Sequence, residues 1–201
     1  MKRILYLLAI ILALFSCHKS NESKINALIK SDLSEVMHDF NSYEPISTDL
    51  DSVFDAAFFD ENAWSLSEKI VENNEMLESI ESDIERLRFD LDMAGVSRNR
   101  QRIKELTDRG DRLLSDMKSK IDENKDLRDS IRSINDLAGH DFVGYLCNHK
   151  FRCNNGMGNK ILVDAGFFID AECTKIMYRI FDDEDEKQVA QIAASLNKME
   201  D

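Results

Sequence analysis

Two runs of residues spaced alternately by four and three positions occupy the middle third of the chain. This spacing is the heptad repeat of a coiled-coil helix. The first run is Leu66, Ile70, Asn73, Leu77, Ile80, Ile84, Leu87, Leu91 and Ala94, and the second is Ile103, Leu106, Gly110, Leu113, Met117, Lys120, Asn124, Leu127, Ile131, Ile134 and Ala138. Continuing the first register past residue 94 places only polar residues on the seam, so we predict two helices rather than one.

A short turn between the two runs predicts that the second helix folds back on the first. Gly95 can adopt a left-handed helix end, and Ser97 can cap the next helix. Folding there pairs Leu91 with Ile103, and the seams stay in register to the far end. We therefore predict an antiparallel coiled-coil hairpin over residues 66–138, with its turn near 94–98.

Polar residues interrupt this seam near the base of the predicted hairpin. Asn73 is expected to face Lys120, and Asn124 is expected to face Ile70. Such positions specify helix register at some expense of stability. The alternative is a partly hydrated base at which another region or a partner docks.

The chain after Gly139 changes from helical spacing to the two-residue alternation of strands. Three strands are predicted, over 142–153, 161–169 and 173–181, with the turn-forming residues 154–159 joining the first two. Val189, Ile192, Ala193 and Leu196 then share one face of a closing helix. We predict a small βββα domain over residues 139–201, and hence an α+β fold in which one helix packs on an antiparallel sheet.

The segment before the hairpin, residues 25–65, is predicted to be helical. Apolar residues from Ile25 to Phe40 follow helical spacing, Pro45 breaks that helix, and a second helical piece is expected through Val53 and Phe58. The aromatic residues of this segment are expected to fill a core.

The first residues carry a targeting sequence. Lys2 and Arg3 precede a run of apolar residues from Ile4 to Phe15, which is too short for a membrane span, and the run ends in Leu14-Phe15-Ser16-Cys17. This pattern resembles the lipobox of bacterial lipoproteins. The resemblance implies that residues 1–16 are a signal peptide, that Cys17 is lipidated, and that residues 17–24 form a tether. It also implies a cell-envelope location on a bacterial membrane, with the outer membrane favoured and the mature part in the periplasm or at the cell surface.

Charge narrows the choice of partners. Removing residues 1–16 takes away Lys2 and Arg3 and no acid, so the net charge changes from −13 to −15. Such an acidic chain disfavours nucleic acid and anionic headgroups as partners. We expect attachment to a membrane through the lipid on Cys17, a protein partner at the helical arm, and no nucleic acid.

Three cysteines remain beyond the lipobox, namely Cys147, Cys153 and Cys173. Cys147 and Cys153 lie too far apart along one strand to bond each other, whereas Cys173 could pair with either. Cys147 and His149 share a strand face, which allows a nucleophile and base or two metal ligands, but neither pattern is specific. We predict no metal, no cofactor and no enzymatic activity.

Two segments resemble uncharacterised Gram-negative envelope lipoproteins. They are Tyr43-Glu44-Pro45-Ile46, followed by Asp51-Ser52, and His149-Lys150-Phe151-Arg152, followed by Asn155 and Gly158-Asn159. The resemblance implies no activity, but it draws attention to His149, Lys150, Arg152 and Asn155 as a ligand or partner site. The expected function is a non-enzymatic scaffold, spacer or protein-interaction module. The alternative is a ligand-binding module that uses the sheet and the 154–159 loop, and a cysteine-dependent enzyme is the third class.

Overall fold

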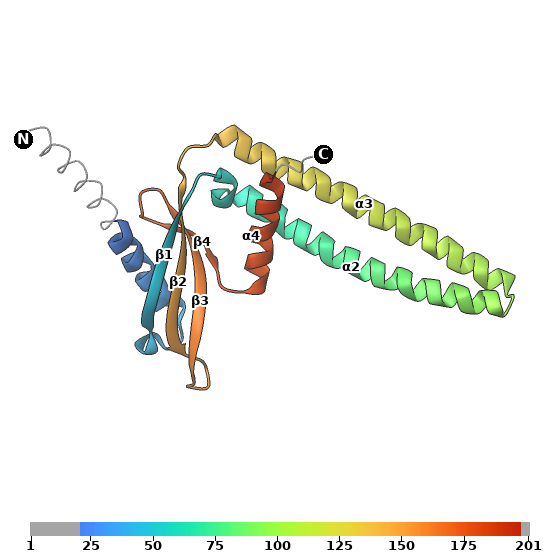
Figure 1. Ribbon diagram of the computed structural model, residues 1–201, viewed down its shortest axis with the longest axis horizontal. Coiled ribbons are helices and arrows are strands. Elements are labelled where there is room, and N and C mark those ends of the chain that lie inside the picture. Colours follow the sequence, from blue (N-terminus) through green and yellow to red (C-terminus); the bar gives the residue numbers. More distant parts are fainter. Residues whose placement is uncertain (1–20, 198–201) are drawn as a thin grey trace, which may run out of the picture. The chain divides into compact units, whose positions relative to one another are not determined.

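A computed structural model describes residues 21–197 of the chain (Figure 1). The predicted signal peptide and Cys17 lie outside the described residues. The chain divides into two compact units, one of residues up to 59 together with 138–186, and one of residues 60–137 together with those from 187 onward. Long helices and a four-stranded antiparallel sheet confirm the predicted α+β class. None of the described helices combines the length and apolar character needed to cross a bilayer.

The first unit is a sheet with a helix over one face. Its strands, in spatial order, are β1 (Glu44–Val53), β2 (Gly144–Asn154), β3 (Lys160–Asp170) and β4 (Ile176–Ile180), all antiparallel. The helix over residues 21–36 brings Ile25, Ile29 and Leu33 onto the inner face of the sheet. Their four-residue spacing lines one side of the helix. Cys147, Phe151, Cys153, Ala165, Phe167, Ile169 and Cys173 complete this core.

The three strands predicted after residue 139 are present, although the third begins at Ile176 rather than Cys173, and the alternation of β2 and β3 follows the predicted faces. In β2, Cys147, His149, Phe151 and Cys153 are buried, while Asn148, Lys150 and Arg152 are exposed. The loop over 154–159 connects β2 to β3 as predicted. Two short helices, η1 (Phe40–Ser42) and η2 (Ala56–Phe59), flank β1.

The prediction of a second helical piece through Val53 and Phe58 is wrong for the residues up to Val53, because Glu44–Val53 form the edge strand β1. The preceding helix ends at residue 36, short of the expected break at Pro45, and residues 40–42 form the separate helix η1. The following residues alternate in direction, however, so that Thr48 and Leu50 lie opposite His149 and Cys147 and share the inner face with them. Pairing with β2 satisfies the backbone hydrogen-bonding groups of this segment. The local spacing of apolar residues does not predict this pairing.

The second unit is built around two long helices that run side by side, α2 (Glu61–Val96) and α3 (Arg100–Ala138) (Figure 1). The Asp60 carboxylate begins α2 by accepting hydrogen bonds from the Asn62 and Ala63 amides, at 2.8 and 3.0 Å. Leu87, Ala94 and Leu106 form a small core between the helices, and Arg109 pairs with Asp83 across them at 3.3 Å. The helical hairpin is therefore present, whereas its supercoiling as a coiled coil stays a prediction.

The hairpin turn is built by different residues from those expected. Arg98, not Gly95, takes the left-handed conformation, with φ of 52°. The Arg98 amide donates to the Gly95 carbonyl at 3.1 Å and the Asn99 amide to the Ala94 carbonyl at 3.2 Å, which is the Schellman arrangement of a helix end. Asn99, not Ser97, then caps α3, because its side chain accepts from the Arg102 amide at 3.1 Å.

The polar positions of the seam contact each other rather than the residues expected. The Asn73 amide donates to Asn124 Oδ1 at 2.9 Å, and the Asn124 amide donates to Asn74 Oδ1 at 2.9 Å. The predicted partners, Lys120 for Asn73 and Ile70 for Asn124, are therefore wrong. Asn73 and Asn124 are both buried, so pairing satisfies two amides that water cannot reach.

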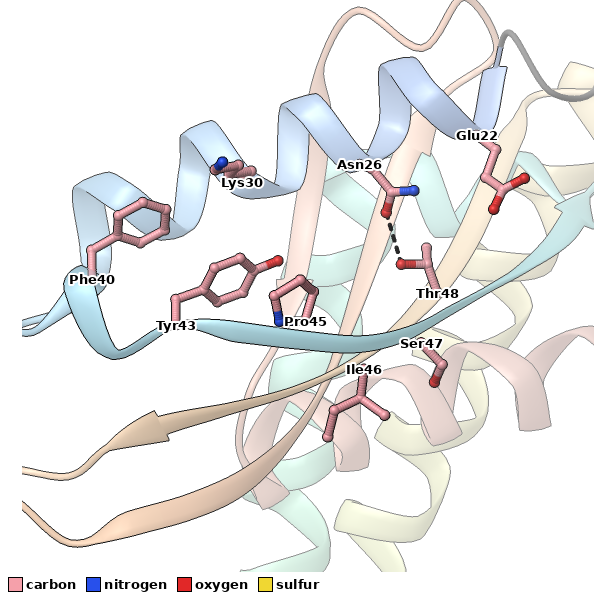
Figure 2. A pocket seen from close by; sticks show the side chains of 9 residues that line it. All are labelled: Glu22, Asn26, Lys30, Phe40, Tyr43, Pro45, Ile46, Ser47 and Thr48. Carbon is pink, nitrogen blue, oxygen red and sulfur yellow. Dashed lines mark hydrogen bonds between the residues drawn. The ribbon is translucent and has the colours of Figure 1, made fainter.

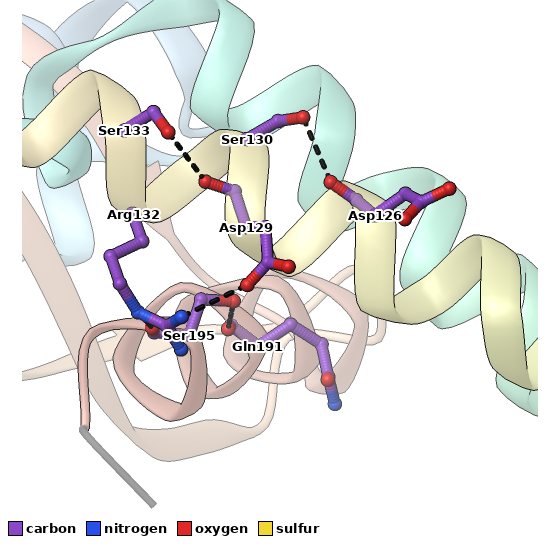
Figure 3. A network of polar contacts seen from close by, with 7 residues as sticks. All are labelled: Asp126, Asp129, Ser130, Arg132, Ser133, Gln191 and Ser195. Atoms are coloured by element: carbon purple, nitrogen blue, oxygen red, sulfur yellow. Dashed lines mark hydrogen bonds and ion pairs between the residues drawn. The ribbon is translucent and has the colours of Figure 1, made fainter.

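The C-terminal helix α4 (Asp183–Leu196) was expected on the sheet, but its residues from 187 onward group with the hairpin. Figure 3 shows Arg132 of α3, whose Nε donates to the Ser195 carbonyl at 3.2 Å while its Nη1 lies 2.9 Å from Asp129. Arg128 also donates to Gln191 Oε1 at 3.2 Å. The helix that packs on the sheet is therefore the N-terminal one, at residues 21–36.

Candidate functional site

The structure does not bring the four predicted site residues together. His149 is 1% exposed and lies on the inner face of the sheet. Lys150 and Arg152 are exposed on the opposite face, where Lys150 pairs with Asp164 at 3.1 Å and Arg152 lies across from Glu44. Strand alternation imposes this separation, because neighbouring residues point to opposite faces.

Asn155 is occupied in shaping its own loop. Its side-chain oxygen accepts hydrogen bonds from the Met157 and Asn159 amides, each at 3.0 Å, and its backbone bonds to Asn159 and Gly158 at 2.8 Å. Gly158 has φ of 78°, which suits glycine in such a turn. The 154–159 loop therefore has a structural explanation that needs no ligand.

His149 is the centre of a buried polar chain that joins three elements. Its Nε2 lies 2.9 Å from the Tyr43 hydroxyl, and its Nδ1 lies 2.9 Å from Thr48 Oγ1. Thr48 Oγ1 in turn donates to Asn26 Oδ1 at 2.7 Å. The chain of contacts thus runs from residue 43 through β2 and β1 to the N-terminal helix.

These contacts fix the tautomer of His149. A threonine hydroxyl has one proton, and Thr48 gives it to Asn26, so Thr48 must accept the proton on His149 Nδ1. His149 Nε2 is then the unprotonated nitrogen and accepts from the Tyr43 hydroxyl. When the imidazole is neutral, every residue in this chain of hydrogen bonds has a suitable partner.

Burial shifts the pKa values of the two titratable groups, His149 and Tyr43, in the directions that keep both neutral. Desolvation lowers the pKa of His149 below its ordinary value of 6.5, against a smaller opposite effect of a hydrogen bond with the Ser47 backbone. Desolvation also raises the pKa of Tyr43. Both groups therefore carry no charge at pH 7, as the hydrogen-bond directions require.

Aromatic rings pack around this chain. Phe40 stacks on Tyr43 with ring centroids 5.3 Å apart, and His149 stacks on Phe151 at 5.6 Å. Tyr43 also contacts Phe151 at 5.4 Å. The rings hold the Tyr43 hydroxyl and the imidazole in place, so the site is pre-formed.

A groove of about 620 Å³ lies over this chain of hydrogen bonds, between the N-terminal helix and the outer edge of the sheet. Figure 2 shows its walls, with Glu22, Asn26 and Lys30 on the helix, Tyr43 just before β1, and Pro45, Ile46, Ser47 and Thr48 on β1. The helix residues are four apart and so line one side. The groove offers a carboxylate, an ammonium, an amide and hydroxyls to a polar ligand.

Sequence reasoning missed Asn26, Tyr43 and Thr48 as members of a site with His149. The two segments singled out by resemblance are in fact strand neighbours, because Glu44 lies opposite Arg152 and Pro45 opposite Phe151. The alternation of Thr48 and Leu50 with Asp49 and Asp51 was the pattern that could have revealed this strand.

The cysteines of the described region are all free and buried. Burial raises the pKa of Cys147 to about 12, and it also raises the pKa of Cys153 and of Cys173. A protonated thiol is a poor nucleophile, and the imidazole nitrogens of His149 are already engaged by Tyr43 and Thr48. These observations argue against Cys147 and His149 as a nucleophile and base.

Comparisons with known proteins add no relative. No protein-family model matches the chain, and no curated protein or solved structure shows significant similarity to it.

Proposed function

We propose that this protein is a lipid-anchored protein of the bacterial cell envelope that acts without catalysis, as a scaffold, spacer or protein-interaction module. Lipidation of Cys17 would place the sheet unit beside a membrane. Asn21, the first described residue, follows Cys17 by four positions, a reach of about 14 Å for extended chain. The N-terminal helix would therefore start close to the bilayer surface.

The observation that carries the interaction role is the hairpin. α2 and α3 contain 36 and 39 residues, which corresponds to about 54 and 58 Å of helix. Between them lies an apolar hollow of about 340 Å³ floored by Leu87, Leu106 and Gly110. Leu114 at its rim is largely exposed. An arm of this kind suits contact with a partner or separation of two surfaces.

Two measurements test this proposal. Metabolic labelling with a radioactive fatty acid should label the wild-type protein and not Cys17→Ser, and only the wild type should stay with membranes after washing. A photo-crosslinking residue at Leu114 should then capture a neighbour in intact cells, whereas one at exposed Lys125 should not. Absence of label contradicts the anchor, and equal crosslinking at both positions contradicts a partner at the arm.

The groove beside His149 favours ligand binding as a second candidate function. The pre-formed chain from Tyr43 to Asn26 and the opposite charges of Glu22 and Lys30 suit a small polar ligand. Native mass spectrometry of the protein purified from its own envelope should show an added mass. Asn26→Ala should lose this mass, and Asn148→Ala, on the exposed face of the sheet, should retain it. No added mass, or one retained by Asn26→Ala, contradicts this role.

A further inference from the structure

The end of the helical hairpin is basic in an acidic chain. We call residues 88–104 the hairpin tip. They contain five cations, Arg88, Arg98, Arg100, Arg102 and Lys104, and two acids, Asp90 and Asp92, for a net charge of +3 in a chain of −13. The net charge of the whole chain disfavours anionic headgroups as partners, but it does not reveal this local cluster of cations.

The cations of the hairpin tip are largely free to meet a ligand. Arg102 has an ion pair, with Glu105 at 3.8 Å. Within the described residues, Arg98, Arg100 and Lys104 have no ion pair, and all three are exposed. Their charge is therefore not neutralised within the fold.

Three large apolar side chains accompany these cations. Phe89, Met93 and Val96 are 67, 56 and 82% exposed. Their spacing of four and three residues puts them on one face of α2, on the side away from Leu87 and Leu91, which pack toward α3. The packing of the hairpin therefore does not require them to be apolar.

The backbone conformation of Arg98 gives a further reason to assign a role to its charge. Its φ of 52° is the left-handed conformation that glycine adopts without penalty, and here arginine occupies the first position after the helix end. Among the described residues the Arg98 guanidinium has no partner that would explain this choice. The end of the arm thus carries a cation at a position where glycine would suit the turn better.

We propose that the hairpin tip binds a bilayer surface that carries anionic headgroups. Phe89, Met93 and Val96 of α2 enter the boundary between headgroups and acyl chains, and the cations of the turn and of the first residues of α3 contact phosphate groups. Apolar side chains beside Arg and Lys are the pattern of interfacial membrane binding. The inference rests on the proposed function only in placing the arm in an envelope, and it supplies the surface that the arm contacts.

Vesicle sedimentation with residues 18–201, which contain every described residue, tests this inference without the lipid. We expect co-sedimentation with vesicles of equal parts phosphatidylglycerol and phosphatidylcholine, and affinity at least about tenfold lower for phosphatidylcholine alone. Raising the salt concentration should weaken binding. Replacing Phe89 and Val96 by serine should weaken it as well.

Matched variants separate the hairpin tip from general charge. Arg98→Glu, Arg100→Glu and Lys104→Glu together should abolish binding. Arg112→Glu, Lys118→Glu and Lys125→Glu together change the net charge equally at exposed positions of α3 away from the hairpin tip and should leave binding intact. Equal loss in both triple variants, binding to polyglutamate without binding to vesicles, or no binding at all would overturn the inference. None of these results bears on lipidation of Cys17, which the labelling experiment tests separately.

Discussion

The Tyr43 hydroxyl lies 2.9 Å from Nε2 of His149, although 106 residues separate the two in sequence. Tyr43 donates and the imidazole accepts, because Thr48 takes the proton on the other ring nitrogen. This hydrogen bond ties the start of β1 to the middle of β2 beneath the groove.

Tyr43→Phe should therefore destabilise the protein. The change keeps the ring that packs on Phe40 and Phe151 but leaves Nε2 of His149 buried without a donor. We expect a loss of about 1–3 kcal/mol in the free energy of unfolding, measured by urea titration. Phe40→Leu, which disturbs the ring packing but no hydrogen bond, serves as the control. A stability equal to that of the wild type would contradict the assigned hydrogen bond.

Stability should fall in mild acid because of His149. Its pKa is lowered in the folded state, so the unfolded chain binds more protons below the ordinary value of 6.5. The free energy of unfolding should therefore decrease as the pH drops through 6.5 and level off below the folded pKa. Urea midpoints between about pH 7.5 and 5.5 would show this decrease. His149→Gln should remove most of it, whereas His38→Gln, at a histidine outside this chain of hydrogen bonds, should not.

Asn73 and Asn124 should behave as a pair. Asn124→Ala removes the Oδ1 acceptor of the buried Asn73 amide and should lower the free energy of unfolding by about 1–3 kcal/mol. Asn73→Leu with Asn124→Leu should restore or exceed wild-type stability but relax helix register. Thermal unfolding measures the first effect and analytical ultracentrifugation the second. A double variant no more stable than Asn124→Ala would show that the two residues do not act together.

Arg98→Gly should stabilise the hairpin turn by up to about 1 kcal/mol, because glycine adopts the left-handed conformation freely. The same change should weaken vesicle binding if the hairpin tip contacts lipid. Arg100→Gly, at the first position of α3, removes the same charge and should destabilise the helix. A loss of stability in Arg98→Gly would contradict the assigned turn.

The three buried thiols should resist modification in the folded protein. Since burial raises the pKa of Cys147 to about 12 and also raises the pKa of Cys153 and Cys173, little thiolate exists at pH 8. Reaction with an aromatic disulfide reagent should be slow until denaturant is added, and then rapid at all three. Fast reaction of Cys147 in the native state would reopen its assignment as a nucleophile.

Regular periodicity decided which elements could be predicted. The heptads of α2 and α3 and the alternation of β2 repeat over many residues, so both were recognisable from sequence. Strand β1 was missed because Pro45 and the register shift between Pro45 and Ser47 interrupt its alternation. Its pairing with a strand some hundred residues later cannot be read from a local window.

The candidate site was harder to predict from the sequence than the fold, for the same reason. His149 was identified, but Asn26, Tyr43 and Thr48 join it only through the misassigned strand. Lys150 and Arg152 are near His149 in sequence, yet the pleat directs them to the other face. The hydrogen-bond partners at the hairpin turn could not be predicted either. Whether Gly95 or Arg98 takes the left-handed conformation depends on where α2 ends.

The hairpin is inserted between two strands that pair with each other, since Val53 and Gly144 are partners across β1 and β2. Closing a loop of some ninety residues is entropically unfavourable and slows the formation of distant contacts. Helices and their turn form from local contacts and return the chain to its starting point. We therefore expect the arm to assist folding as well, because it shortens the effective distance between β1 and β2 before the sheet assembles.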